Sequence, residues 1–239
     1  MALFDFLNTG ENNSDEQRND HFSSSRMTDT GFVDSLINLF RTKPAVLKAY
    51  FGLLYDEENG KSDLFLAVDH QGEVEELKKA TYFIKNAFLP AQQLFFTSKE
   101  DQPELMDFIK ETNFPFYVKD KTQVLNVLIM KLWFDPTFKK SFIQQIKMSR
   151  ITSLFKDFDP HSEIINFQTF IRDGKEFIPL FSEREMIFKS GMTQVPADLT
   201  VAEFDWKKIN EAVDHGVKEH FYVLNPGTSF EVAFNVELT

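Results

Sequence analysis

The 239-residue sequence contains no cysteine, only 9 glycines and 2 tryptophans, and no long hydrophobic run. Without cysteine there is no disulfide, no thiolate nucleophile and no cysteine-ligated zinc or iron–sulfur site, which fits a reducing compartment. Because about 18 successive apolar residues are needed to cross a bilayer, we expect no transmembrane segment. The first residues lack the basic leader of a signal peptide, so we predict a cytoplasmic protein.

Basic residues are outnumbered, with 26 lysines and arginines against 37 aspartates and glutamates and a net charge of −11. Affinity for a phosphate backbone comes from lysine and arginine, so we expect no nucleic-acid partner. Phenylalanine, in contrast, occurs 28 times. Its side chain has no hydrogen-bonding group, so this excess predicts an aromatic core and apolar grooves.

The chain divides into four predicted regions: a disordered N-terminal tail, a first module, a helical linker and a second module, at residues 1–30, 31–120, 121–150 and 151–239. The tail is too polar to offset its ordering entropy, and its apolar tag Met1–Leu7 is either a docking segment or a frayed end. The linker pattern breaks at Asp135-Pro136, where aspartate can cap a new helix. We predict an α+β fold in which each α/β module is a mixed sheet packed with helices.

The first module shows the predicted order β-β-α-β-α-β after an opening helix. Apolar spacing predicts the helices, and runs of β-branched and aromatic residues predict the strands. The predicted helices are Phe32–Phe40, Glu73–Phe88 and Pro103–Thr112, and the predicted strands are Val46–Leu54, Leu64–Val68, Leu94–Phe96 and Phe114–Val118, with the last at an edge.

The second module is marked by two motifs. Asp173-Gly174 is a tight-turn pair that predicts a hairpin between Ile164–Ile171 and Glu176–Phe181. Phe177, Ile178, Pro179, Leu180 and Phe181 make both faces of the second arm apolar, and Pro179 favours an edge position. Asn225-Pro226-Gly227 predicts a type II turn after the strand Phe221–Leu224.

Two further helices are predicted in this module. Ser182-Glu-Arg-Glu185 matches a capping box, so we expect a helix that opens at Ser182 rather than a nucleophilic serine. Asp205–His215 is predicted as a helix that Gly216 ends.

Several spaced motifs together resemble the enhanced serine sensitivity (SseB) family of bacterial proteins. The first module resembles the C-terminal domain of that family through Asp34–Phe40, Lys48–Phe51, Asp63–Asp69, Gly72–Glu76 and Pro115–Tyr117. Residues 125–235, with Gly174…Phe-Ile-Pro-Leu-Phe181 and Val223-Leu-Asn-Pro-Gly227, are similar to its N-terminal domain. The resemblance implies that the two family domains stand here in reversed order. The family's name comes from a serine-sensitivity phenotype, and the resemblance implies no catalytic residues.

The residues themselves predict no catalytic site, metal site or cofactor. Asp157, Asp159, His161 and Glu163 alternate in one run, but proline interrupts it and a solvated loop is favoured. His215 and His220 flank a glycine turn without a third ligand. Phosphate-loop, dinucleotide and zincin motifs are all missing from the sequence. We therefore favour a protein that is not an enzyme.

Two functions remain open. The first is a non-catalytic protein-interaction or regulatory module, with a protein partner or self-association through Phe-lined surfaces such as that of Phe177, Pro179 and Phe181. The alternative is a sensor of a small, amino-acid-like molecule, or an uncharacterised enzyme, with a pocket near Asn225, Pro226 and Gly227. There, the amide and nearby backbone N–H groups could bind a carboxylate.

Overall fold

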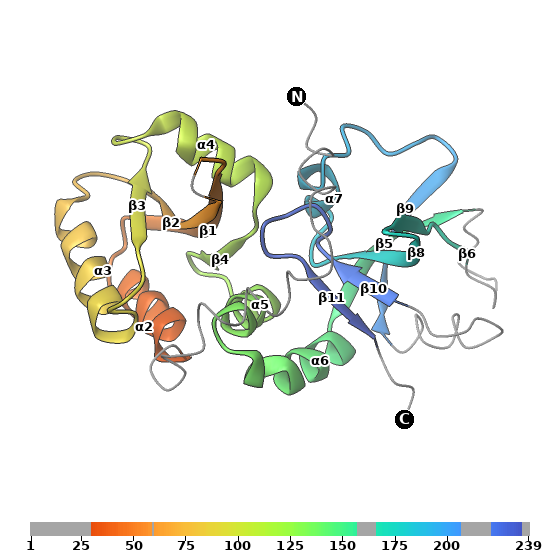
Figure 1. The fold of residues 1–239 in the computed structure, drawn as a ribbon, viewed down its shortest axis with the longest axis horizontal. Coiled ribbons are helices and arrows are strands. Elements are labelled where there is room, and N and C mark those ends of the chain that lie inside the picture. Colours follow the sequence, from red (N-terminus) through yellow and green to blue (C-terminus); the bar gives the residue numbers. More distant parts are fainter. Residues whose placement is uncertain (1–29, 59, 157–165, 207–220, 236–239) are drawn as a thin grey trace.

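The computed structural model describes residues 30–58, 60–156, 166–206 and 221–235. The predictions for the tail, for Met1–Leu7, for the run 157–163 and for the helix beyond residue 206 lie outside these residues. Two mixed sheets, each accompanied by helices, stand side by side with two further helices between them (Figure 1). The α+β fold class predicted from the sequence is confirmed.

The described helices are α2 Thr30–Arg41, α3 Glu75–Phe88, α4 Pro103–Thr112, α5 Val124–Phe134, α6 Lys139–Met148 and α7 Met186–Lys189, with the 3₁₀ turn η2 Pro136–Phe138. The described strands are β1 Val46–Asp56, β2 Lys61–His70, β3 Leu94–Ser98, β4 Pro115–Val118, β5 Arg150–Lys156, β6 Asn166–Phe167, β7 Phe170–Arg172, β8 Lys175–Phe181, β9 Leu199–Asp205, β10 Phe221–Leu224 and β11 Val232–Asn235.

The first sheet has the strand order β3-β2-β1-β4, which confirms the predicted element order and places β4 at an edge. β1 and β2 form an antiparallel hairpin, and β2 runs parallel to β3. Side chains alternate between the two faces of the sheet. Leu64 and Leu66 join the main core with α2 and α3, whereas Phe65 and Ala67 face the opposite side, where α4 packs.

The second sheet has the order β11-β10-β8-β5-β6, with β9 paired to β5 and β7 paired to β8. The expectation that Pro179 occupies an edge strand is wrong, because β8 lies between β10 and β5. β9 and β11 are not among the strands predicted from the sequence. The apolar character predicted for both faces of β8 is confirmed, since residues 177–181 are all buried.

The hairpin at Asp173-Gly174 is confirmed, with φ of 51° and 72° at its two turn residues, as a type I′ turn requires. Its first arm is shorter than predicted. Only Phe170–Arg172 pairs with β8, and Asn166–Phe167 pairs instead with β5. The capping box at Ser182 is wrong, because α7 begins four residues later and the Ser182 hydroxyl accepts a hydrogen bond from Asn225.

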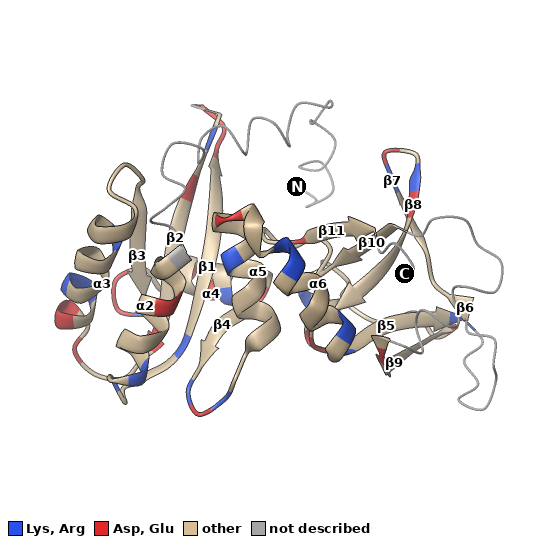
Figure 2. Ribbon diagram, turned by 90° about the horizontal axis from the view of Figure 1, so that it is seen from below, with Lys and Arg blue, Asp and Glu red and all other residues tan. Residues whose placement is uncertain are grey.

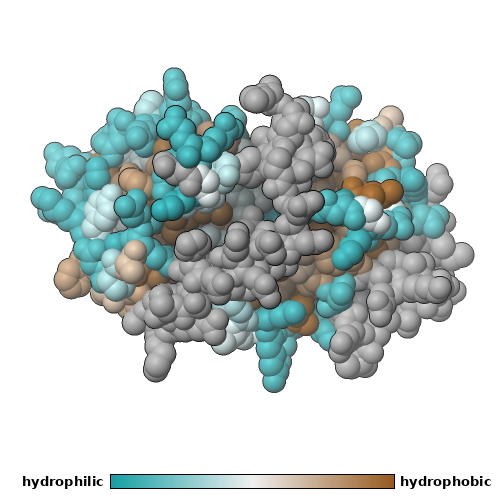
Figure 3. Space-filling model, viewed as in Figure 1, coloured by the Kyte–Doolittle hydropathy of each residue, from teal (hydrophilic) through white to brown (hydrophobic). Residues whose placement is uncertain are grey.

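One continuous aromatic core joins the two modules. Phe230, in the loop between β10 and β11, is 2% exposed. Its ring lies 6.5 Å from that of Phe51 in β1, 6.4 Å from that of Phe114 and 5.4 Å from that of Trp133 in α5. The predicted aromatic core is thus confirmed. Outside this core, hydrophilic side chains cover much of the first module on the face that Figure 3 shows.

The predicted linker is helical as expected, with its break at Asp135, whose side chain accepts a hydrogen bond from the Thr137 N–H at 2.9 Å. These helices are part of the core. Ile129, Met130 and Phe134 of α5 are buried, and the Phe134 ring meets those of Phe32 and Phe51. The linker therefore forms a layer shared by both sheets.

Candidate anion-binding site

The predicted site residues of β10 and its turn are packed inside the molecule. Asn225 is fully buried with a left-handed φ of 51°. Its Oδ1 accepts from the Ser182 N–H at 2.9 Å, and its Nδ2 donates to Ser182 Oγ at 3.1 Å. The type II turn is confirmed, because the Thr228 N–H donates to the Asn225 carbonyl and Gly227 has a φ of 79°.

A carboxylate does accept a hydrogen bond from one N–H group of this turn, but it belongs to the chain. Glu231 Oε2 accepts from the Gly227 N–H at 2.9 Å. The same carboxylate receives a two-pronged contact from the Arg172 guanidinium, whose Nη2 lies 3.1 Å from Oε2 of Glu231, while Nη1 meets Oε1. The groups that the sequence suggested for an external carboxylate are therefore used internally.

The structure brings the two sequence motifs together. β8 and β10 run parallel, with Pro179 opposite Val223, and Asn225 fastens the ends of both strands. Phe177, Pro179 and Phe181 are buried in the sheet, Pro226 is buried and Gly227 is half-buried. These residues have evident structural roles, and a role in ligand binding stays a prediction.

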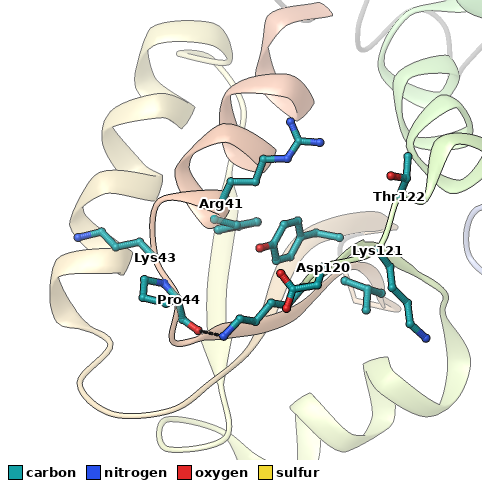
Figure 4. A pocket seen from close by; sticks show the side chains of 10 residues that line it. Arg41, Lys43, Pro44, Asp120, Lys121 and Thr122 are labelled. Carbon is teal, nitrogen blue, oxygen red and sulfur yellow. Dashed lines mark hydrogen bonds between the residues drawn. The ribbon is translucent and has the colours of Figure 1, made fainter.

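A cavity of about 410 Å³ lies elsewhere, between the end of α2 and the loop that follows β4 (Figure 4). Four of its lining residues are basic and one is acidic. The lining residues are Phe40, Arg41, Lys43, Pro44, Tyr117, Val118, Lys119, Asp120, Lys121 and Thr122. We call this cavity the basic pocket.

A tight turn builds one wall of the basic pocket. The Lys121 N–H donates to the Val118 carbonyl at 3.1 Å, and Asp120 adopts a φ of 60°. Aspartate tolerates this left-handed conformation better than most residues do. Lys119 Nζ donates to the Pro44 carbonyl at 2.7 Å and so ties this turn to the opposite wall (Figure 4).

The floor of the basic pocket is aromatic. The buried Phe40 ring packs on Tyr117 at 5.4 Å. Burial, reinforced by the Asp120 carboxylate, raises the pKa of Tyr117, and Arg41 partly opposes this rise. The phenol, which is protonated at neutral pH even at its ordinary pKa of 10.0, can donate a hydrogen bond.

The cations around this floor are largely available to a ligand. Lys43 lies 3.7 Å from Glu76, but the two side chains are 40% and 90% exposed, so the pair is weak. Arg41 and Lys121 form no salt bridge with another described residue. In Figure 2, basic segments at the end of α2 and after β4 lie along one edge of the molecule. Such an arrangement suits carboxylate or phosphate groups.

A second, smaller cavity of about 120 Å³ lies between the modules and shares Val118 and Lys121 with the basic pocket. Lys189 of α7 lines it and donates to the carbonyls of Lys110 and Asn113 at 2.8 and 2.7 Å. These carbonyls end α4, where a cation is favourable. Burial lowers the pKa of Lys189, and Glu185 partly restores it. This contact fastens α7 to the first module.

Sequence reasoning did not find the basic pocket. Its cations come from two short runs, Arg41–Lys43 and Lys119–Lys121, which are far apart in the chain. Each run alone resembles an ordinary solvated loop. One signal could have indicated the pocket. Each basic run follows an element predicted for the same module, and the chain as a whole is acidic.

The described part of the chain holds no group of three or more His, Asp or Glu residues arranged to bind a metal ion. Within the same residues, no helix combines the length and apolarity needed to span a membrane.

Comparison with known proteins shows that part of the chain is similar to a known protein family. Residues 26–119 match the model of the SseB protein C-terminal domain. This part of the chain is therefore similar to the C-terminal domain of SseB proteins. The match spans the whole first sheet with α2, α3 and α4, and so includes every residue of the basic pocket up to Lys119. No match was found among the curated proteins or the solved structures. The similarity of the second module to the family's N-terminal domain, and the reversed order, stay predictions.

Proposed function

We propose that this SseB-family chain is a non-catalytic interaction or regulatory module that recognises an anionic group of its partner in the basic pocket. The observation that carries the proposal is the gathering of Arg41, Lys43, Lys119 and Lys121 around one cavity in a chain of net charge −11. An acidic protein repels anions in general, so a local reversal of charge favours a specific anionic ligand. We assign the module to the bacterial cytoplasm.

Tyr117 of the pocket is better suited to binding than to catalysis. A general acid or base works best with a pKa near the operating pH. The shift of Tyr117 is upward from 10.0, away from neutrality, because of burial and Asp120. Its hydroxyl is thereby suited to orient a ligand and poorly suited to remove a proton.

A charge-matched pair of variants tests this function. R41Q/K43Q/K121Q removes three cations from the basic pocket, and K139Q/K140Q/K147Q removes three exposed cations from α6. Thermal shifts and NMR titrations with citrate, inorganic phosphate and a hexaglutamate peptide report binding. We expect at least one of these anions to bind the wild type and the α6 variant but not the pocket variant. Equal binding by both variants, or no binding by the wild type, would refute the proposal.

A further inference from the structure

The cations of the basic pocket do not converge on one point. Figure 4 shows Arg41, Lys43 and Lys121 extending in different directions around the central Asp120. One compact anion can therefore contact only one or two of them. Because a single exposed ion pair contributes only about 0–1 kcal/mol, specific binding requires several separated negative charges on one ligand.

The centre of the pocket disfavours a compact anion. The Asp120 carboxylate lies near the middle of the pocket (Figure 4), where it adds to the effect of burial in raising the pKa of Tyr117. A phosphate or carboxylate placed there would meet a like charge, which is a repulsive element of specificity. The same carboxylate disfavours the continuous phosphate chain of a nucleic acid.

The floor is suited to an apolar side chain. Tyr117, Pro44 and Val118 supply its apolar surface, and the Phe40 ring, which is 0% exposed, packs beneath Tyr117. A cavity of about 410 Å³ is of the size that holds a small ligand or a large side chain. An apolar centre with a charged rim is also the usual anatomy of a protein–peptide contact.

We infer that the ligand is an extended acidic peptide segment of a partner protein, in which acidic residues stand on both sides of an aromatic or large apolar residue. The apolar side chain rests on Tyr117, Pro44 and Val118, and the flanking carboxylates meet Arg41 and Lys43 on one side and Lys121 on the other. This inference rests on the proposed function, because it names the partner of the same pocket.

Fluorescence anisotropy with four labelled nine-residue peptides tests the inference. The first has a central phenylalanine and two glutamates on either side. The second replaces the phenylalanine with serine, the third replaces the glutamates with glutamines, and the fourth moves all glutamates to one side. We expect the first peptide to bind most tightly and each change to weaken binding by about tenfold or more. R41Q/K43Q/K121Q should lose the same peptide, and K139Q/K140Q/K147Q should retain it.

Competition separates this inference from the proposed function. If citrate or inorganic phosphate binds the wild type as tightly as the first peptide, or if the peptide without phenylalanine binds equally well, the peptide inference fails while anion recognition stands. If neither the small anions nor the peptides bind more weakly to R41Q/K43Q/K121Q than to the wild type, both the peptide inference and the proposed function fail. Tighter binding of a single-stranded DNA oligonucleotide would overturn the partner class. D120N, which keeps a residue suited to positive φ, should strengthen the binding of citrate relative to the peptide.

Discussion

The buried hydroxyl of Ser153 in β5 donates a hydrogen bond of 2.7 Å to the carbonyl oxygen of Pro179 in β8. On this side of β8, pairing with β7 ends at Phe177 and pairing with β5 begins at Leu180. Pro179 therefore stands at the change of partner, where no backbone donor is required. This gap explains how a proline occupies a central strand, a position it normally avoids.

Ser153→Ala should destabilise the protein by about 1–3 kcal/mol, because the Pro179 carbonyl would be buried without a partner. Thr42→Ala is the matched control, since the Thr42 hydroxyl donates to the Leu39 carbonyl at the same distance of 2.7 Å but at the surface. Its expected cost is below about 0.5 kcal/mol. Urea unfolding measures both. Equal costs would contradict the role given to burial.

The strand around Pro179 also shows what the sequence can and cannot predict. Five successive apolar residues predicted a strand buried on both faces, and local patterning is sufficient for that. The neighbours of the strand depend on residues far away in the chain, including Ser153, whose hydroxyl has no local signature. The same limit applies to the basic pocket, where α2 and β4 were predicted correctly but their contact was not.

Two substitutions of Asn225 separate the stability that comes from its side-chain hydrogen bonds from the cost of its backbone conformation. Asn225→Ala loses both hydrogen bonds to Ser182 and puts alanine, which tolerates positive φ less well than asparagine does, at a φ of 51°. Asn225→Gly loses the same bonds but accepts positive φ without strain. We expect both variants to be destabilised, with glycine more stable than alanine by about 1 kcal/mol in urea unfolding. If the alanine variant is as stable as the glycine variant, backbone strain at residue 225 does not contribute to the stability difference.

Local sequence predicted the turn at Asn225, because proline and glycine have fixed backbone preferences. It did not predict that Ser182 and Glu231 would occupy the polar groups of this turn. A turn that resembles a ligand site and a turn that fastens two strands share the same residues. Only their tertiary partners distinguish them.

Phe230 packs against both modules, so we expect it to couple their unfolding. Phe230→Ala removes a ring that is 2% exposed and contacts both β1 and α5, so it should cost about 3–5 kcal/mol. We expect the wild type to unfold in one transition by calorimetry and the variant to unfold in two. Phe188→Ala, at a ring that is 50% exposed, serves as control and should preserve the single transition. A single transition at nearly unchanged temperature in Phe230→Ala would contradict this account.

Two buried tyrosines make the stability of the fold decrease at alkaline pH. Burial raises the pKa of Tyr222 from 10.0 to about 12. Burial and, in smaller measure, Asp69, Glu185 and Glu183 raise the pKa of Tyr50 to about 12. The folded protein thus holds these phenol protons more tightly than the unfolded chain does. The resulting stability is complete below pH 10 and is lost as the pH rises towards 12.

Tyr222→Phe removes one of these two titrations and should flatten the loss of stability between pH 10 and about 12. The wild type should lose of order 2 kcal/mol more than the variant across this window, because each unit of pKa corresponds to about 1.4 kcal/mol. Lys189, whose pKa burial lowers, opposes the loss equally in both proteins and therefore cancels in the difference. Urea unfolding at matched ionic strength measures the two curves, and parallel curves would show that the Tyr222 phenol does not limit alkaline stability.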